Sequence, residues 1–262
     1  MTIRQRLRWY ARKLRRVDRP RVFSVADRRI VIHHRGEIAH LNAIDQVFTQ
    51  RQYEIPAIGA NMHAAAHAHY AAIVAAGGVP LIIDAGANIG ASALWLAATY
   101  PAALIVAVEP AADNLALLRQ NCATRQYDIH AAAIGPADGE TMLTNIAAGA
   151  DGYQTRDDAP DGTPVPVISI ATLLHAHPTA EPFLLKVDIE GAEKALFSGD
   201  GAMLDRFPII AMEPHDWMLP GQRTALPFFR FHVEHERDFG YQGENIFSFS
   251  AALITGRLEP RR

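Results

Sequence analysis

The sequence predicts an α/β fold whose mostly parallel sheet is doubly wound, that is, covered by helices on both faces. Apolar strand-like runs alternate with helical segments, the runs being LIID (81–84), ALIVAVE (103–109), IHAAAI (129–134), FLLKVD (183–188) and PIIAME (208–213). Such alternation is typical of parallel strands joined by helical crossovers. The closing segment GYQGENIFSFS (240–250) adds two short runs around a Gly-Glu-Asn turn. It predicts an antiparallel C-terminal edge and brings the sheet to seven strands.

The first 55 residues are predicted to form an N-terminal extension with a helix and a cap, and residues 56–262 the sheet domain. Within the extension, a strand-like run at 28–34 and a helix around 43–52 are expected to form the cap. A helix-favouring, alanine-rich stretch at 59–76 then leads into the first strand of the sheet, because the glycine pair and proline that follow it stop a helix.

Residues 1–21 predict a basic amphipathic helix, because they hold nine Lys or Arg against one Asp and one apolar stripe of Ile3, Leu7, Tyr10, Leu14 and Val17. The stripe could pack on its own domain, on a second subunit of a homodimer, or on an anionic membrane surface. The remaining chain has 16 basic and 27 acidic residues, a net charge of −11. Nucleic acid is not expected as a partner, since this acidic body carries no second basic patch.

The cysteine content and the N-terminal sequence predict a cytoplasmic protein. Because of the basic helix, peripheral contact with the inner face of the membrane remains an alternative. The single cysteine, Cys122, excludes a disulfide framework and a CxxC pair, and the N-terminus lacks the apolar core of a signal peptide. The stretch 85–108 contains no charged residue, and Glu109 comes directly after it. We interpret it as strand, turn, helix and strand buried in a parallel sheet, and not as a membrane span.

The strongest chemical motif is DAGANIG (84–90), which lies between the first apolar strand and a helical run. In an open α/β sheet, ligands bind at the carboxyl ends of the strands near the point where the strand order reverses. Gly86 and Gly90 allow a sharp bend and a close backbone approach to a ligand. Asp84 ends the strand, where its carboxylate could reach the ligand. The spacing differs from the GxGxxG dinucleotide fingerprint, which favours a cofactor without a pyrophosphate.

A second signal is Glu109, which ends the next strand, 25 residues beyond Asp84. A carboxylate at this place can accept hydrogen bonds from both hydroxyls of a ribose. Alternatively, it only caps the next helix or is solvated. Its pairing with the glycine turn favours the ribose role.

Three landmarks resemble the FkbM-type methyltransferases: DAGANIG, the VEP at 108–110 followed by Asn114 and Leu118, and KVDIEGAE (186–193). The resemblance covers roughly residues 45–250, and Ala171 departs from it where the family commonly has an aspartate. It implies a Rossmann-like class I methyltransferase fold, S-adenosylmethionine as the cofactor, and O-methylation of a hydroxyl on a saccharide, glycolipid or natural product. The cofactor-binding residues that it implies are Asp84, Gly86, Asn88, Ile89, Gly90, Glu109, Pro110, Asn114 and Asp188.

The segment KVDIEGAE also has a physical interpretation of its own. Asp188 ends a buried strand, so Asp188 and Glu190 are expected beside the cofactor turn, where an acceptor hydroxyl could meet the methyl group. A carboxylate there could accept the proton that the hydroxyl loses. Alternatively, Asp188 caps the following helix and Glu190 stabilises its N-terminus.

The fifth strand ends in MEPHDW, which places Glu213 and His215 on the same rim. His215 is a candidate general base because the ordinary pKa of histidine lies near neutrality. His63 and His67 have the i, i+4 spacing of a helical metal pair, but no glutamate follows His63 as in HExxH. We therefore expect no metal site at these histidines. Carboxylate clusters can also hold Mg²⁺, which is the alternative for Asp188 and Glu190, although no metal site is expected overall. The candidate catalytic residues are Asp188, Glu190 and His215.

Two other functions remain as alternatives. One is an NAD-type oxidoreductase on a similar sheet, which the glycine spacing disfavours. The other is a membrane-associated scaffold that keeps the cofactor fold without catalysis. Neither a GxSxG elbow nor a P-loop lysine motif is present, which argues against a hydrolase or a phosphotransferase.

Overall fold

The computed structural model describes residues 19–56, 60–124, 126–145, 153–156 and 159–260. The predicted basic helix therefore lies almost wholly outside the described residues. Its last residue belongs to a different element, because strand β1 begins at Arg21.

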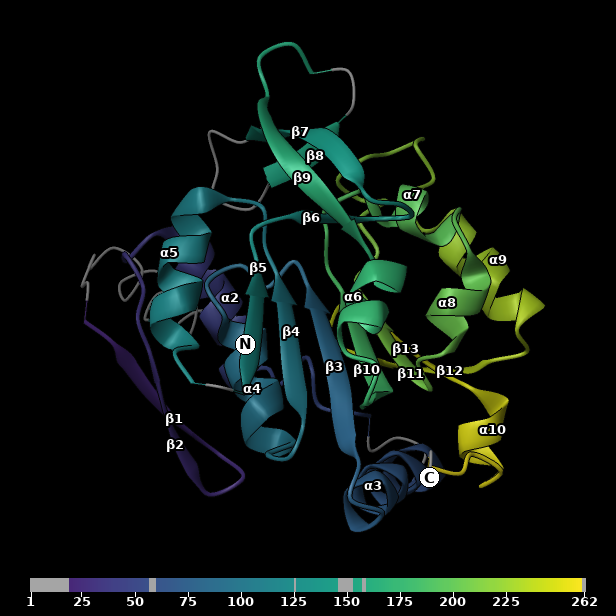
Figure 1. Ribbon diagram of the computed structural model, residues 1–262. Coiled ribbons are helices and arrows are strands. Elements are labelled where there is room, and N and C mark those ends of the chain that lie inside the picture. The colour runs from purple at the N-terminus through teal and green to yellow at the C-terminus, as the bar shows by residue number, and fades with distance from the viewer. Residues whose placement is uncertain (1–18, 57–59, 125, 146–152, 157–158, 261–262) are drawn as a thin grey trace, which may run out of the picture.

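The centre of the molecule is a seven-stranded sheet with the spatial order β12-β13-β11-β10-β3-β4-β5 (Figure 1). Five adjacent strands are parallel to one another, namely β3 (Val79–Ala85), β4 (Leu104–Val108), β5 (Tyr127–His130), β10 (Ala180–Val187) and β11 (Ile209–Met212). The antiparallel end consists of β12 (Asp238–Gln242) and β13 (Asn245–Phe249). The predicted doubly wound sheet, with its seven strands and antiparallel C-terminal end, is confirmed.

Helices cover both faces of this sheet because successive strand residues point to opposite sides. Along β3, Ile82 packs in one apolar core, whereas Leu81 and Ile83 pack in the other. The first core joins the sheet to α2 (Ile38–Phe48), α3 (Ala60–Ala75), α4 (Ala91–Thr99), α5 (Ala112–Asn121) and α10 (Ala251–Ile254). The second core joins it to α6 (Ile170–Ala176), α7 (Glu193–Phe197), α8 (Gly201–Asp205) and α9 (Leu226–Glu234).

The segment 136–166, expected to be a long excursion rich in turns, contains three strands instead. Together with β6 (Ala133–Gly135), the strands β7 (Gly139–Asn145), β8 (Tyr153–Arg156) and β9 (Thr163–Ser169) form a four-stranded sheet of order β6-β9-β7-β8. This sheet lies above the carboxyl ends of β3, β4 and β5 (Figure 1). The expected strand 129–134 is accordingly divided between the two sheets. Frequent Gly, Asp and Pro concealed these strands from the sequence, although Leu143 and Val165 pack in a small core of their own.

The described part of the extension is a hairpin and a helix. Strands β1 (Arg21–Val25) and β2 (Arg28–Ile32) pair around Ala26 and Asp27, which both have positive φ angles, as a tight hairpin turn requires. Helix α2 begins earlier and ends earlier than the expected 43–52. It packs against α4, which follows the glycine turn.

The uncharged stretch 85–108 comprises the end of β3, the turn, helix α4 and strand β4, as expected. No helix among the described residues is both long and apolar enough to cross a bilayer.

Candidate active site

A cavity of about 470 Å³ opens at the carboxyl ends of β3, β4, β10 and β11. Its walls come from the turns that follow these strands and from α2 of the N-terminal extension. The strand order reverses between β3 and β10, because the chain continues from β3 to β4 on one side and from β10 to β11 on the other. Ligands bind at such a point in open α/β folds.

The turn after β3 depends on glycine. Gly86 has a φ of +78°, and a Cβ there would collide with the carbonyl oxygen of Asp188. The amide nitrogens of Gly86 and Ala87 both donate to the carbonyl oxygen of Val108 at 3.0 Å. The turn is therefore fixed between the ends of β4 and β10, with its backbone facing the cavity.

The carboxylate of Glu109 lies at the far side of this turn and is bound mainly by backbone. Its Oε2 accepts from the amide of Asn88 at 2.9 Å, and its Oε1 accepts from the amide of Ala111 at 2.9 Å and from Nδ2 of Asn114 at 3.4 Å. Burial raises the pKa of Glu109, while these hydrogen bonds act in the opposite direction. Glu109 still lines the cavity, together with Asn88 and Asn114.

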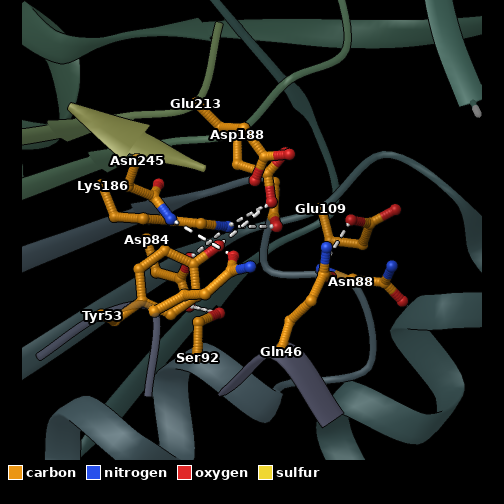
Figure 2. A network of polar contacts seen from close by, with 12 residues as sticks. Gln46, Tyr53, Asp84, Asn88, Ser92, Glu109, Lys186, Asp188, Glu213 and Asn245 are labelled. Atoms are coloured by element: carbon orange, nitrogen blue, oxygen red, sulfur yellow. Dashed lines mark hydrogen bonds and ion pairs between the residues drawn. The ribbon is translucent and has the colours of Figure 1, made fainter. Parts of the chain in front are cut away.

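Lys186 is the centre of a buried ionic cluster at the base of the cavity (Figure 2). Its Nζ donates to the carbonyl oxygen of Gly86 at 2.7 Å and lies 3.0 Å from Oδ1 of Asp84 and 3.5 Å from Oδ2 of Asp188. Burial alone would lower the pKa of Lys186, but Asp84 and Asp188 outweigh it, so the pKa is raised and the ammonium stays charged. Lys186 thus connects the glycine turn with the acid at the end of β10.

Asp188 is held on several sides while part of it remains open. The hydroxyl of Tyr53 donates to its Oδ2 at 3.2 Å, and Nε2 of His215 lies 3.5 Å from its Oδ1. The side chain of Asp188 is nevertheless 27% exposed. The alternative role as a helix cap is not seen, since α7 begins after Ala192 with no side-chain cap.

His215 is fixed from behind by a carboxylate without solvent exposure. Its Nδ1 lies 2.7 Å from Oε1 of Glu193, the first residue of α7, whose Oε2 accepts from the amide of Gly191. Burial lowers the pKa of His215, but the carboxylates of Glu193 and Asp188 raise it by more, so that the pKa is raised to about 9. Nε2 of His215 therefore points at Asp188 and carries a proton near neutral pH.

Two further acids lie at the same rim. Glu213 is 7% exposed, and its pKa is raised to about 8, first by burial and then by the charge of Asp188. Figure 2 shows its carboxylate beside that of Asp188. Glu190 lines the cavity with a φ of +52°, an uncommon conformation for a residue other than glycine.

The structure brings together most, but not all, of the predicted site residues. The cavity is lined by Gly86, Asn88, Glu109, Pro110, Asn114, Asp188, Glu190 and His215. Three predicted cofactor residues lie behind it. Asp84 is fully buried, with Ser92 donating to its Oδ2 at 2.6 Å, Ile89 is fully buried in the first core, and Gly90 faces Leu118 and Cys122. These three shape the turn from within, so the expected reach of Asp84 to the ligand is not seen.

Sequence reasoning missed Lys186, Tyr53 and Glu193. Lys186 could have been noticed, since a charged residue in an otherwise apolar buried strand needs partners. Glu193 stands in the KVDIEGAE segment, but its contact with His215 joins two turns that are 22 residues apart. Tyr53 comes from the N-terminal extension and gave no signal of its own.

The turn fits a nucleoside cofactor such as S-adenosylmethionine. Oδ1 of Asn88 is buried and has no hydrogen-bond partner among the described residues. The turn keeps its shape because Gly86 has no Cβ to collide with the carbonyl oxygen of Asp188, and the carboxylate of Glu109 borders the cavity. These oxygens can accept hydrogen bonds from the hydroxyls of a ribose and from the ammonium group of an amino acid without rearrangement of the sheet.

Comparison with known proteins gives one match in sequence and several distant ones in structure. The family model described as the methyltransferase FkbM domain matches residues 84–242. A search of curated proteins gave no significant match. Among solved structures, the O-methyltransferase TomG from Streptomyces achromogenes, in complex with SAM, has a TM-score of 0.40 and 14% identity over 82% of this chain and 91% of TomG. Precorrin-6y C5,15-methyltransferase from Geobacter metallireducens has a TM-score of 0.35 and 12% identity over 66% of this chain and 81% of that protein.

Proposed function

Because this chain belongs to the FkbM methyltransferase family and is therefore an S-adenosylmethionine-dependent methyltransferase, we propose that its acceptor is a hydroxyl group on a saccharide, a glycolipid or a natural product. The observation that carries this proposal is the partly exposed carboxylate of Asp188, which is held at the base of the cavity by Lys186, Tyr53 and His215. A hydroxyl acceptor has to lose a proton, and a fixed carboxylate at that place can receive it.

When bound, S-adenosylmethionine supplies a methyl group on a positively charged sulfur; the hydroxyl oxygen forms the new C–O bond as the C–S bond breaks, leaving neutral S-adenosylhomocysteine. Glu109, Asn88 and the backbone at Gly86 would hold the cofactor, with Pro110 and Asn114 completing that wall. Alignment of the two reactants is the largest contribution that the protein can make to such a displacement.

Asp188 is the proton acceptor in this scheme, and His215 is not. The raised pKa of His215, about 9, leaves its Nε2 protonated near neutral pH, so that it is a donor toward Asp188. Lys186 and Tyr53 act on the other oxygen of Asp188 and keep it oriented. Glu190 borders the same space, where it would accept a hydrogen bond from a second acceptor hydroxyl.

The outer rim of the cavity suits a saccharide. Trp217 is 72% exposed there, so its indole is free to stack on the C–H face of a sugar ring. Carboxylates of Glu244, Asp45 and Asp113 border the same cavity and can accept hydrogen bonds from ring hydroxyls.

The test is transfer of a labelled methyl group to fractionated material. The protein is incubated with methyl-labelled S-adenosylmethionine and with separate polysaccharide, lipid and small-molecule extracts, and each product is tested for resistance to mild base, which cleaves methyl esters but not ethers. Base-stable label in a hydroxyl-bearing product supports the proposal. Label found only on nitrogen, carbon or carboxyl groups would refute O-methylation of a hydroxyl.

Two further measurements separate the alternatives. Titration with S-adenosylhomocysteine and with NAD distinguishes a methyltransferase from an oxidoreductase. Absence of methyl transfer to every extract, despite tight binding of S-adenosylhomocysteine, would favour a scaffold. Cytoplasmic location, membrane contact through the N-terminal segment, a homodimer and the lack of a nucleic-acid partner remain predictions.

A further inference from the structure

Three possible metal-ligating side chains converge beside the proposed acceptor position. Asp188 follows β10, while Glu213 and His215 follow β11, the neighbouring parallel strand. One donor atom from each side chain lies within 4.8 Å of the other two. The sequence placed these residues on one rim, but it did not indicate a metal site for this set, because no spacing motif joins residues from two separate strands.

The spacing of the three donor atoms is close to that of ligands around a small divalent cation. Nε2 of His215 lies 3.5 Å from Oδ1 of Asp188 and 3.8 Å from Oε1 of Glu213. Ligands at about 2.1 Å from a metal, with angles between octahedral and tetrahedral, are separated by roughly 3.0–3.5 Å. These distances are too long for good hydrogen bonds, and slight contraction would place all three atoms around one ion.

The histidine is oriented as a metal ligand requires. Metal-bound histidines commonly donate their second ring N–H to a carboxylate, which fixes the tautomer and the ring plane. Here Nδ1 of His215 lies 2.7 Å from Oε1 of Glu193, which has no exposed surface and is anchored by the amide of Gly191. This leaves Nε2 facing the two remaining carboxylates.

The environment of Glu213 is an independent observation that points to a ligand at this place. Its side chain is only 10% exposed, yet it accepts no hydrogen bond within the described part of the chain, and its nearest charged partner is Nε2 of His215 at 3.8 Å. Burying a carboxylate without compensation is costly. A group that binds Glu213 directly would remove this cost.

The charge balance points to a cation. The connected cluster contains four carboxylates, from Asp84, Asp188, Glu193 and Glu213, and one ammonium group, Lys186. With His215 as a neutral ligand these charges sum to −3, and one divalent ion lowers the excess negative charge to −1.

We propose that Asp188, Glu213 and His215 bind one divalent cation of the class that accepts both carboxylate oxygen and imidazole nitrogen, such as Mn²⁺. The ion takes the place of the proton on Nε2 of His215. Its position rests on the geometry alone, whereas its role rests on the proposed function: an acceptor hydroxyl that enters its open coordination positions becomes more acidic. Asp188 would then hold the metal with one oxygen and remain bound to Lys186 and Tyr53 through the other.

The experiment measures Mn²⁺ binding directly and does not depend on turnover. Full-length protein is freed of metal with a chelator, saturated with S-adenosylhomocysteine and titrated with Mn²⁺, while electron paramagnetic resonance reports the free ion. We expect one site per chain that Glu213→Gln and His215→Ala each weaken by at least ~10-fold. Glu193→Gln, which would not touch the ion, should weaken it by about 10- to 100-fold through the orientation of the imidazole.

A matched control comes from a second cluster in the same protein. Oδ2 of Asp128 lies 3.0 Å from Nε2 of His130 and 2.9 Å from Nε2 of His177, outside the cavity. His177→Ala should leave the Mn²⁺ affinity within about twofold, since Mn²⁺ favours carboxylate-rich sites. Loss of the bound Mn²⁺ in this control would move the site to that cluster and overturn the proposal.

Unchanged Mn²⁺ affinity in both Glu213→Gln and His215→Ala, or no binding by the wild type at millimolar Mn²⁺, would also overturn it. Circular dichroism and the affinity for S-adenosylhomocysteine show whether each variant is folded, and Glu213→Asp replaces Glu213→Gln if the latter is not. Methyl transfer in the presence of EDTA is recorded separately. A wild type that transfers methyl groups but binds no Mn²⁺ overturns the metal site and leaves the proposed function intact.

Discussion

Replacement of Glu109 by glutamine should weaken cofactor binding although the two side chains have the same shape. Both oxygens of Glu109 accept hydrogen bonds from backbone N–H groups, Oε2 from Asn88 and Oε1 from Ala111, at 2.9 Å each. A glutamine has only one acceptor oxygen. Whichever way it is turned, its NH₂ group faces an N–H donor and one backbone amide loses its partner.

The expected magnitude follows from the ribose hydroxyls, which would lose a charged acceptor, because glutamine has one neutral acceptor oxygen in place of the carboxylate. A hydrogen bond to a charged group contributes about 1.5–3 kcal/mol, so the affinity for S-adenosylhomocysteine should fall by roughly 10- to 150-fold. Removal of the buried charge acts in the opposite direction on stability. Burial raises the pKa of Glu109, so a neutral side chain has a smaller desolvation penalty at this position. The removed charge and the unpaired backbone amide change the stability of the free protein and of the complex alike, whereas the weaker acceptor affects only the complex, so the net effect on cofactor affinity is a loss.

Isothermal titration with S-adenosylhomocysteine measures the affinity, and thermal unfolding of the ligand-free variant measures its stability. Glu234→Gln is the matched control, since it removes the same charge from an exposed position on α9. An affinity for Glu109→Gln within twofold of the wild type, with the control also unchanged, would remove Glu109 from the cofactor site.

Four further outcomes are expected. Asp188→Asn should lower the initial rate of methyl transfer by ~10²-fold or more with S-adenosylhomocysteine affinity within a few-fold, and a wild-type rate would return Asp188 to a structural role. Trp217→Ala should raise the KM for a saccharide acceptor without lowering the affinity for S-adenosylhomocysteine, and an unchanged KM would exclude stacking. Neither ring nitrogen of His69 has a hydrogen-bond partner among the described residues, and burial lowers the pKa of His69. The unfolded state therefore binds the proton first, and the free energy of unfolding falls as the pH drops below about 6.5. His69→Leu should raise the free energy of unfolding by about 1 kcal/mol and reduce this loss at acidic pH, which denaturant titrations from neutral to acidic pH would test. Deletion of residues 1–18, which spares β1, should leave cofactor affinity intact and reduce co-sedimentation with anionic vesicles at low salt, whereas full-length protein that stays in the supernatant would exclude membrane contact.

The sheet was predictable because its strands are buried on both faces. Residues of β3 alternate between the two apolar cores, so an unbroken apolar run is required there, and such runs are visible in a single sequence. The strands β7 and β9 were not predictable in the same way. They pair with each other in a small sheet whose core is slight, and their Pro and Gly residues read as turns.

The glycine turn that is proposed to hold the cofactor was predictable because it is local. Gly86, Asn88 and Glu109 belong to two short motifs at the ends of adjacent strands, and parallel strands bring their carboxyl ends together. The acceptor side depends on contacts between distant segments. Tyr53 donates to Asp188 across 135 residues of sequence, a contact that no local pattern contains.

The role of Asp84 shows why a correct motif can assign a wrong contact. The motif places an acid at the end of β3, and the structure confirms that position, but the carboxylate turns inward to Lys186 and Ser92. Through Lys186 it still acts on the site, because the same ammonium binds the carbonyl oxygen of Gly86 and the carboxylate of Asp188. A shift of Lys186 would therefore displace the glycine turn and Asp188, the proposed proton acceptor, together. Methyl transfer requires donor and acceptor to be aligned with each other, and one buried cation joined to both sides is a direct way to achieve this.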